Sequence, residues 1–518
     1  MIKEMVEKND HRLQRFLEIL PGFLTWSLLL SPVWLGIFYP SLIIFFLTFL
    51  TVFWFYLGIK FIYGAFKGYN KYQEELKVQW YEELKSLDFK KLPDKETLPA
   101  SLKDLKQFVL IPVVNESREI LEAGFKSFMD QTFPSKQVFL TYTIEEKYSE
   151  EVTKNIKDMI KPFEDRFEKI LIFTHPAGIV GEAIGVGGAN RTWGAKGTIE
   201  YMKKNKMDIK NYIFSSLDAD HVLHENYLSR LSHLYLSNDK RNNKFFTTAV
   251  HLFNNNHWQV PVLARVEANA VTIGTISEWA ISHEFKETFA AYSCSLQTLI
   301  DADYWDVTLG VDDSVFYWRA FFKRGGDFTG VCHWIPYSAD AVEAETTVKT
   351  YVSLYKQLLR WGWGIVKFPI AIKGFLTEAQ IPLKTKIMWT FKQLEREVLL
   401  INTVFLINFG FATITLVNPY VKQSNFAYSL PDLISFIMTV TLIFLLPGTY
   451  LRLKVAPPFP EKWGIVRKIL GFLEGFAVIV NLLTFSFFPY IEAQTRLMLG
   501  KKMKDLYHTP KVRSSDVK

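Results

Sequence analysis

The stretch that decides the fold is Tyr212-Ile-Phe-Ser-Ser-Leu-Asp218-Ala-Asp220, in which a short apolar run ends in two carboxylates separated by one residue. In an extended strand, residues i and i+2 point to the same face, about 7 Å apart. Two carboxylates at the end of a buried strand are costly unless a positive group lies between them. A divalent cation that holds a phosphate supplies that group, because Mg²⁺ and Mn²⁺ prefer oxygen ligands. The alternative is that the aspartates only cap the helix expected from Glu225 onward.

Strands and helices alternate in the chain before this stretch. Strands are expected at 108–114, 137–143 and 169–174, and helices at 117–131, 149–162 and up to about 204. Such alternation predicts an α/β domain with a mostly parallel sheet covered on both faces. Ligands of these sheets bind beyond the carboxyl ends of the strands. Polar residues follow those ends, and we expect them at one edge as a nucleotide site: Asn115, Glu116, Glu145, Glu146, Asp218 and Asp220.

The region 245–350 is less regular. A strand at 245–250 and a long helix near 259–287 are expected, followed by the acidic pair Asp312-Asp313 at the start of an amphipathic helix. This pair is either a second functional carboxylate site or a helix cap. The glycine-rich loop 178–188 matches neither G-x-G-x-x-G nor G-x-x-x-x-G-K-[ST], and we expect it to let the backbone approach a ligand.

Apolar runs frame the α/β region, at 17–39 and 41–64 before it and at 397–417, 432–450 and 469–490 after it. Each approaches the roughly 20 residues that cross a bilayer. Basic residues flank the first two runs but not the link between them, which predicts a hairpin with both flanks in the cytoplasm. Two buried core helices are the alternative. Three crossings after the domain would place the basic tail outside, so either one run is re-entrant or the charge rule fails once.

The sequence therefore predicts six segments. They are an N-terminal transmembrane hairpin (1–69), a stalk (70–106), a cytosolic α/β domain (107–350), an interfacial amphipathic helix (351–380), C-terminal transmembrane helices (381–495) and a basic tail (496–518). The interfacial prediction rests on the mixture of apolar and basic residues in this helix.

Composition narrows the class of partner. The chain has 518 residues, a formal charge of +7 and only two cysteines, which excludes a disulfide framework and a cysteine-rich zinc site. Basic residues cluster beside the apolar runs, which favours an anionic lipid surface over nucleic acid. The first apolar run has no small-residue cleavage site, so no cleaved signal peptide is expected.

Three motifs now stand in order: Asp218-Ala-Asp220, Asp312-Asp313 and Gln357-Leu-Leu-Arg360-Trp361. The series resembles the D-x-D, E/D-D and Q-x-x-R-W motifs of membrane-embedded family 2 glycosyltransferases, such as cellulose and hyaluronan synthases. The strand end Pro112-Val-Val-Asn115-Glu116 also resembles the first strand of that family. The resemblance covers about 107–505, and it implies a GT-A-like domain between N- and C-terminal transmembrane helices. The acidic pair departs from the family, which usually has Glu-Asp.

The resemblance implies an inverting, hexosyltransferase-type enzyme that transfers sugar from a UDP- or GDP-sugar to a growing polysaccharide, with Mg²⁺ or Mn²⁺ as cofactor. Its catalytic domain would lie on the cytoplasmic side of the cell membrane. Asp313 would be the general base and Asp220 the metal ligand. The implied donor-binding residues are Asn115, Glu116, Glu145, Asn190 and Asp218, and the implied acceptor- or diphosphate-binding residues are Asp312, Gln357, Arg360 and Trp361.

Several alternatives stay open. The acceptor could be a lipid, such as a polyprenyl phosphate or a ceramide-type molecule, that receives a single sugar. A transporter or channel is the hypothesis from another class, although no P-loop is present. His221 and His224 are either metal ligands or helix-start residues, and His333 is a candidate for the diphosphate. Trp361 and Trp363 could be interfacial anchors. A second Asp-Ala-Asp, Asp301–Asp303, is expected to be a loop.

Overall fold

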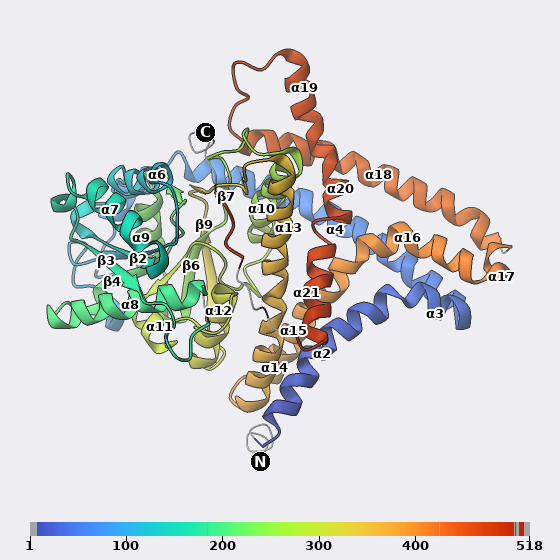
Figure 1. Ribbon diagram of the computed structural model, residues 1–518, viewed down its shortest axis with the longest axis horizontal. Coiled ribbons are helices and arrows are strands. Elements are labelled where there is room, and N and C mark those ends of the chain that lie inside the picture. The colour runs from blue at the N-terminus through green and yellow to red at the C-terminus, as the bar shows by residue number, and fades with distance from the viewer. Residues whose placement is uncertain (1–7, 184, 424, 502, 504–506, 512–518) are drawn as a thin grey trace.

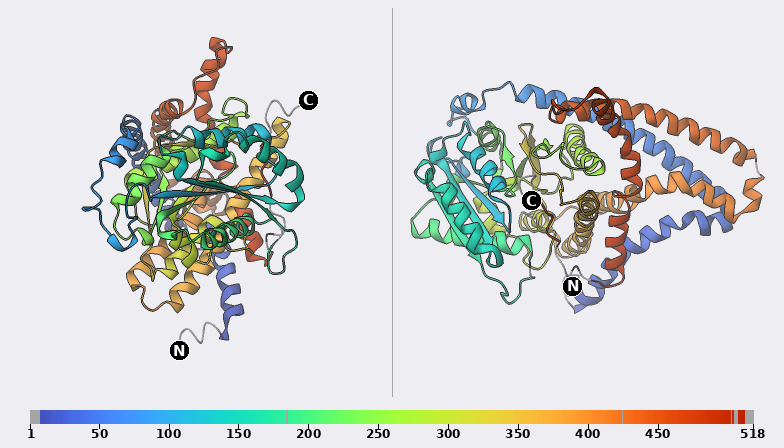
Figure 2. Two further views of the ribbon diagram at one scale, coloured as in Figure 1. Left: turned by 90° about the vertical axis from the view of Figure 1, so that its left-hand side faces the viewer. Right: turned by 45° about the horizontal axis from the view of Figure 1, so that its top comes forward.

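A computed structural model describes residues 8–183, 185–423, 425–501, 503 and 507–511. An α/β domain occupies one end of the molecule, and long helices extend away from it at the other end (Figure 1). Helices that stand between the two parts connect them, among them α13 (Thr347–Gly362), α14 (Lys367–Thr377) and α21 (Phe488–Met498). The right-hand view of Figure 2 shows the same division, and the left-hand view looks onto the α/β domain, with its sheet lying between helices.

The α/β domain is built on a seven-stranded sheet of order β3-β2-β1-β4-β8-β6-β9. Its strands are β1 (Lys106–Val113), β2 (Val138–Glu145), β3 (Lys169–His175), β4 (Tyr212–Ser216), β6 (Lys244–Thr248), β8 (Tyr292–Ser295) and β9 (Thr329–His333). All neighbouring pairs are parallel except those that β8 makes with β4 and β6. The predicted mostly parallel α/β domain is therefore confirmed. Strand β8 was not expected.

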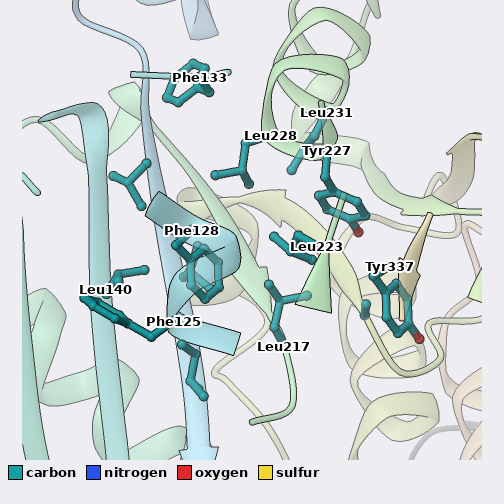
Figure 3. Packing of buried hydrophobic residues seen from close by; sticks show 14 of the residues in the cluster. Phe125, Phe128, Phe133, Leu140, Leu217, Leu223, Tyr227, Leu228, Leu231 and Tyr337 are labelled. Carbon is teal, nitrogen blue, oxygen red and sulfur yellow. The ribbon is translucent and has the colours of Figure 1, made fainter. Parts of the chain in front are cut away.

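Helices cover both faces of this sheet. One face carries α6 (Arg118–Met129), α7 (Ser149–Ile160) and α9 (Tyr227–Ser237), and the other carries α8 (Gly187–Lys204) and α12 (Asp312–Lys323). Alternate residues of β1 pack on opposite faces, with Val109 in the first core and Phe108 in the second. Figure 3 shows the first core, where Phe125 and Phe128 of α6 lie over Leu140 of β2. A shift of one residue in β1 would exchange these two sets, so burial on both sides fixes its register.

The segment 70–106, expected to be a stalk, packs on the α/β domain instead. Helix α4 (Pro40–Glu75) enters the domain and is followed by α5 (Trp80–Lys85), which contacts α9. Trp80 and Leu84 are buried in the first core. Both carboxylate oxygens of Glu75 accept hydrogen bonds from Arg230, at 3.0 and 2.7 Å. The many charged residues of this segment conceal a narrow apolar face, which is why the sequence suggested a stalk.

Within the described residues, three helical segments are long and apolar enough to cross a membrane: Pro40–Glu75, Leu383–Val417 and Ile465–Met498. A fourth is possible if α2 (Asp10–Leu29) and α3 (Ser31–Phe38), which are bent by 56° at their junction, form one span. Phe45 and Leu416 are 72% and 82% exposed on these segments, as expected for a surface that contacts lipid. The predicted run at 432–450 lies within α18 (Asn425–Val455).

The remaining helices join these parts. The predicted interfacial helix is two helices, α13 (Thr347–Gly362) and α14 (Lys367–Thr377), joined by a tight turn at Trp363–Val366. Helix α13 packs against α21 (Phe488–Met498). The others are α10 (Val262–Ile281), α11 (Leu296–Asp301), α15 (Leu383–Leu394), α16 (Ile401–Val417), α17 (Pro419–Lys422), α19 (Ile465–Leu473) and α20 (Val478–Leu483).

Candidate active site

Asp218 and Asp220 lie at the carboxyl end of β4, beside a small sheet of order β5-β10-β7. Its strands are β5 (Val222–Leu223), β10 (Tyr337–Ser338) and β7 (His251–Leu252). Asp220 is 3% exposed, and its Oδ2 accepts a hydrogen bond of 2.9 Å from the backbone N–H of Asp340, just after β10. The side chain of Asp218 is 43% exposed. Neither caps α9, whose N-cap residue is Asn226, so the capping alternative is wrong.

Arg191 connects the two acidic motifs. Its Nη2 lies 2.8 Å from Asp218 Oδ1, and its Nη1 contacts Asp312 directly and lies 4.0 Å from Asp313 Oδ1. The N-cap residue of α12 is Val311, so Asp312 lies in the first turn of the helix rather than at its cap, and its carboxylate pairs with Arg191. The spacing of the motifs in the sequence gave no sign of this arginine. We term Arg191, Asp218, Asp312 and Asp313 the acidic cluster.

A glycine lets α8 approach this cluster. A Cβ atom at Gly188 would lie 2.5 Å from the backbone oxygen of Asp306 and 3.0 Å from Asp312 Cβ. Real side chains do not tolerate such contacts, so the first turn of α8 requires a residue without a side chain at this position. The close approach brings Arg191, one turn later, within reach of α12.

Burial and neighbouring charges separate the acidities of the cluster. Partial loss of hydration would by itself raise the pKa of Asp218, but the charges of Arg191 and Lys511 outweigh it and hold this pKa below its ordinary value. Burial raises the pKa of Asp313 to about 8, where the carboxylates of Asp312 and Asp218 add to the rise and Arg191 opposes it. Asp218 is therefore a permanent anion, whereas Asp313 exchanges its proton near neutral pH. Two carboxyl groups in one site whose pKa values are shifted in opposite directions are typical of sites that carry out acid–base chemistry.

Helix α13 brings the third motif to the same place. Arg360 interacts electrostatically with Asp218 and Asp312, and Gln357 lies one turn earlier on the same face of the helix. The indole of Trp361 lies edge-on to the ring of Phe289, with ring centroids 6.2 Å apart. The residue before Phe289, Thr288, donates a 2.6 Å hydrogen bond to the backbone oxygen of Asp313.

The expected donor residues lie at neighbouring strand ends, in different environments. Asn115 is exposed, whereas the side chain of Glu116 is 7% exposed and accepts a 2.7 Å hydrogen bond from Val114 N–H. Glu145 ends β2 and lies 3.3 Å from His175 Nδ1. The other ring nitrogen of His175 lies 2.9 Å from Glu182, a partner that the sequence did not suggest.

Asn190 has a role that differs from the expected donor contact. Its Oδ1 accepts a 2.6 Å hydrogen bond from the Thr143 hydroxyl, and its Nδ2 donates to Thr143 O at 3.1 Å. The residue is 1% exposed. These bonds attach α8 to β2 and use both polar atoms of the Asn190 side chain. The next residue, Arg191, belongs to the acidic cluster.

Of the three histidines that the sequence singled out, His221 lies at the candidate site, and His224 and His333 have structural positions. His221 lies beside the aspartates, with Nε2 3.9 Å from Asp218 Oδ2. His224 accepts a hydrogen bond from the backbone of Asn226 at the start of α9, and the ring of His333 packs against Tyr227 in the core. These positions fit a helix-start role for His224 and do not favour a diphosphate contact by His333.

The second Asp-Ala-Asp, Asp301–Asp303, is structural. Asp301 ends α11 and pairs with Arg324 at 2.8 Å, and Asp303 pairs with Arg319 at 3.0 Å. The backbone of Asp303 has a φ of 54°. The expected loop is thus a turn after a helix, held by two arginines.

A segment near the C-terminus lies against this site. We term residues 507–511, Tyr507-His508-Thr509-Pro510-Lys511, the C-terminal strap. The Lys511 ammonium contacts Asp220 Oδ1, and the Lys511 backbone forms a parallel bridge with Glu343. The charges of Asp220, Asp218 and Glu116 raise the pKa of Lys511 although its burial opposes them. The sequence had suggested only a basic tail.

The residues present fit a divalent cation. Asp218, Asp220 and His221 offer ligand atoms that all lie within 4.8 Å of one another. His221 Nδ1 accepts a hydrogen bond from Asp218 N–H, and burial lowers the pKa of this ring, so the neutral ring carries its hydrogen on Nε2. The imidazole then donates rather than ligates, which leaves the two carboxylates. Such oxygen donors suit Mg²⁺ or Mn²⁺, and the Lys511 ammonium already places a positive charge on Asp220.

Comparison with known proteins gives distant likeness of the fold. No family model and no curated protein matches the chain. Among solved structures, the mannosyltransferase PcManGT from Pyrobaculum calidifontis, in complex with GDP-Man and Mn²⁺, is 10% identical with a TM-score of 0.42, covering 86% of this chain and 99% of that one. S. aureus TarS, in complex with UDP-GlcNAc, is 13% identical with a TM-score of 0.36, covering 77% and 93%. Likeness this low carries no argument about activity, which therefore depends on the site itself.

Proposed function

We propose that this protein is a membrane-bound, metal-dependent glycosyltransferase that moves a sugar from a nucleotide-sugar donor to a growing polysaccharide. The observation that carries the proposal is the acidic cluster: Arg191 joins the carboxylates of two separate motifs at the edge of a mostly parallel sheet. Asp220 lies beside this cluster, and the Lys511 ammonium contacts its Oδ1. Sugar transfer requires a cation that neutralises the leaving diphosphate and a general base that takes the proton of the acceptor hydroxyl. The site has candidate residues for both tasks.

The donor side of the site is assigned to Asp218, Asp220 and the strand ends. Asp220 would hold Mg²⁺ or Mn²⁺ through Oδ1, because Asp340 N–H already occupies Oδ2. Asp218 would contact the nucleotide or the metal, and its lowered pKa keeps it ionised for that task. When bound, the cation neutralises the charge that develops on the leaving diphosphate. Glu116 and Glu145 are assigned to the nucleoside end of the donor.

The acceptor side is assigned to Asp313 and α13. The Asp313 carboxylate would take the proton of the acceptor hydroxyl as that oxygen attacks the anomeric carbon of the sugar, while the bond to the diphosphate breaks. This single displacement inverts the configuration at the anomeric carbon. Trp361 would offer an apolar face to the acceptor ring, and Gln357 would bond its hydroxyl groups. Arg360 is suited to the phosphate charge, since guanidinium groups bind phosphate oxygens.

The long apolar helices support a location in the cell membrane. The basic residues that flank the first two apolar runs support the cytoplasmic side for the α/β domain, where nucleotide-sugars are available. The polysaccharide assignment rests on the Q-x-x-R-W motif of α13 and on the aromatic pair that Trp361 forms with Phe289. Transfer of a single sugar to a lipid remains the second candidate. It is supported by the apolar, exposed helices beside the same site.

Product analysis separates these two outcomes. Purified protein in nanodiscs would be incubated with Mn²⁺ and a panel of UDP- and GDP-sugars, and the products would be resolved by size. A ladder of sugars supports polysaccharide synthesis, and a single addition to an extractable lipid supports the alternative. The absence of consumption of every donor, with folded protein, would contradict the proposed function.

A further inference from the structure

The C-terminal strap lies across three elements that the proposed function uses. Its Tyr507 hydroxyl bonds the Ser353 hydroxyl of α13 at 2.7 Å, and the ammonium of Lys356 lies 4.9 Å from the centre of the Tyr507 ring. The backbone oxygen of Tyr507 accepts a 3.4 Å hydrogen bond from Arg360 Nη1. The strap is thus anchored on the helix that carries the Q-x-x-R-W motif.

From α13 the strap continues to the acidic strand ends. His508 Nε2 lies 3.9 Å from Glu116 Oε1 at the end of β1, and Thr509 is 7% exposed. Lys511 then reaches Asp220, at the end of β4, and its backbone pairs with Glu343. Within the described part of the chain, residues 507–511 therefore cover both the proposed metal ligand and a proposed donor residue.

Lys511 competes directly for one oxygen atom. Asp220 has two carboxylate oxygens, and the backbone N–H of Asp340 occupies Oδ2. The Lys511 ammonium contacts Oδ1, which is the oxygen left for a cation. A divalent ion at Oδ1 would lie beside a like charge in a site where Asp220 is 3% exposed, so little water would screen their repulsion. The two cations therefore exclude each other.

From these contacts we infer that the C-terminal strap is an autoinhibitory segment, in which the Lys511 ammonium takes the place of the divalent cation on Asp220 until metal and nucleotide-sugar displace it. This inference rests on the proposed function for the identity of the competing ligands. The ammonium of the strap offsets the charge of Asp220 and is the partner of its Oδ1, which has no other hydrogen bond among the described residues. Displacement must therefore be driven by the metal and the donor diphosphate together.

Metal binding without any sugar transfer tests this inference. The full-length protein and its Lys511→Met variant, which keeps the apolar stem but not the charge, would be titrated with Mn²⁺ by EPR in the absence of donor. If the strap occupies Asp220 in nine molecules of ten, its loss lowers the apparent Kd about tenfold. The matched control is Lys501→Met, an exposed lysine of the same C-terminal region, which should bind Mn²⁺ as the wild type does.

The possible outcomes separate the two proposals. Tighter binding by Lys511→Met alone supports the autoinhibitory strap. Equal or weaker binding by Lys511→Met, with Mn²⁺ bound by every variant, overturns the strap and leaves the proposed function standing. If Mn²⁺ binds to none of the folded variants, the metal site of the proposed function is wrong, and the inference falls with it.

A second readout follows the strap itself. Cys294 and Cys332 are both buried, so a nitroxide label can be attached selectively at Pro510→Cys. Adding diamagnetic Mg²⁺ with UDP or GDP should change the label from restricted to mobile, whereas a label at Lys501→Cys should not change. A label at residue 510 that stays restricted under saturating Mg²⁺ and nucleotide would contradict displacement, even if Lys511→Met binds metal more tightly.

Discussion

Two partly buried ionic clusters in this molecule are built on different principles. At the junction with the membrane helices, Lys367 lies 2.9 Å from Glu287 and 3.2 Å from Glu397, and Arg396 lies 3.6 Å from Glu287. Two cations there face two anions, and Trp318 completes the hydrogen bonding of Glu287 at 2.7 Å. We term this set the junction cluster.

The acidic cluster is not balanced in the same way. Asp218, Asp312 and Asp313 share Arg191, with Arg360 nearby, and the adjacent Asp220 depends on Lys511 of the strap. A network with equal numbers of cations and anions needs no further ligand. Where carboxylates outnumber the neighbouring arginines, a positively charged ligand can bind. The comparison teaches that the deficit of positive charge, and not burial or ion pairing alone, distinguishes the acidic cluster from the junction cluster.

The largest expected effect is that of Asp313→Asn. Loss of the general base should reduce transfer by about 10²–10⁴-fold while donor binding stays intact, because the amide keeps the shape but cannot accept a proton. The measurement pairs single-turnover transfer with donor affinity by calorimetry. Asp303→Asn, in the structural Asp-Ala-Asp, is the matched control and should retain activity. Near-normal turnover by Asp313→Asn would refute the assignment of the base.

A second large effect is expected at Asp220. Asp220→Asn should reduce transfer by about 100-fold or more and weaken Mn²⁺ binding, since the amide removes the charge of one of the two carboxylates that face the cation. EDTA should likewise stop the wild-type reaction, and added Mn²⁺ should restore it. Wild-type activity that is unchanged in EDTA would remove the metal from the account.

Methionine substitutions in the two clusters test the comparison itself. Lys367→Met leaves Glu287 and Glu397 without their shared partner and should cost about 3–5 kcal/mol of stability. The turnover of each molecule that remains folded should not change. Arg191→Met should incur a similar cost and also lower turnover, because it frees the carboxylates on both sides of the reaction. Thermal unfolding and active-site-normalised rates give the two readouts. Equal losses of turnover in both variants would erase the distinction between the clusters.

The smallest effect is a shift in pH dependence. Burial raises the pKa of Asp313 to about 8, and a general base acts only when unprotonated. The rate of transfer should therefore fall as pH decreases through 8, by about tenfold per pH unit well below the pKa. Arg191 opposes the rise, so weakening that contact should move the falling limb to higher pH. A profile that is flat from pH 6 to 9 would contradict the base role.

The strands at the acidic edge could be predicted because each is an apolar run that ends in polar residues. Strand β8, Tyr292–Ser295, could not, since the alternation of Tyr-Ser-Cys-Ser spans only four residues, two of them serine, and its burial comes from β4 and β6 on either side. The stalk was wrong for a related reason: Trp80 and Leu84 become buried only because α9 lies against them.

The candidate site divides in the same way. The aspartate motifs and α13 are visible in the sequence because their residues are close together in it. Arg191 is a single arginine whose partners are 27 and 121 residues away, and nothing local marks it. Lys511 was counted as part of a basic tail, because a pairing with Asp220 depends on the folded path of the chain. The contacts of Arg191 and Lys511 could not be predicted, because they join residues that are far apart in the sequence.

The most direct test of the central claim is consumption of a nucleotide-sugar by the purified protein. Wild type and Asp313→Asn would be incubated with UDP- and GDP-sugars, with Mn²⁺ or with EDTA, while release of nucleoside diphosphate and incorporation of sugar are measured together. We predict metal-dependent release and incorporation in equal amounts from wild type and neither from Asp313→Asn. Equal activity of the two proteins, or no metal-dependent consumption of any donor, would contradict the account.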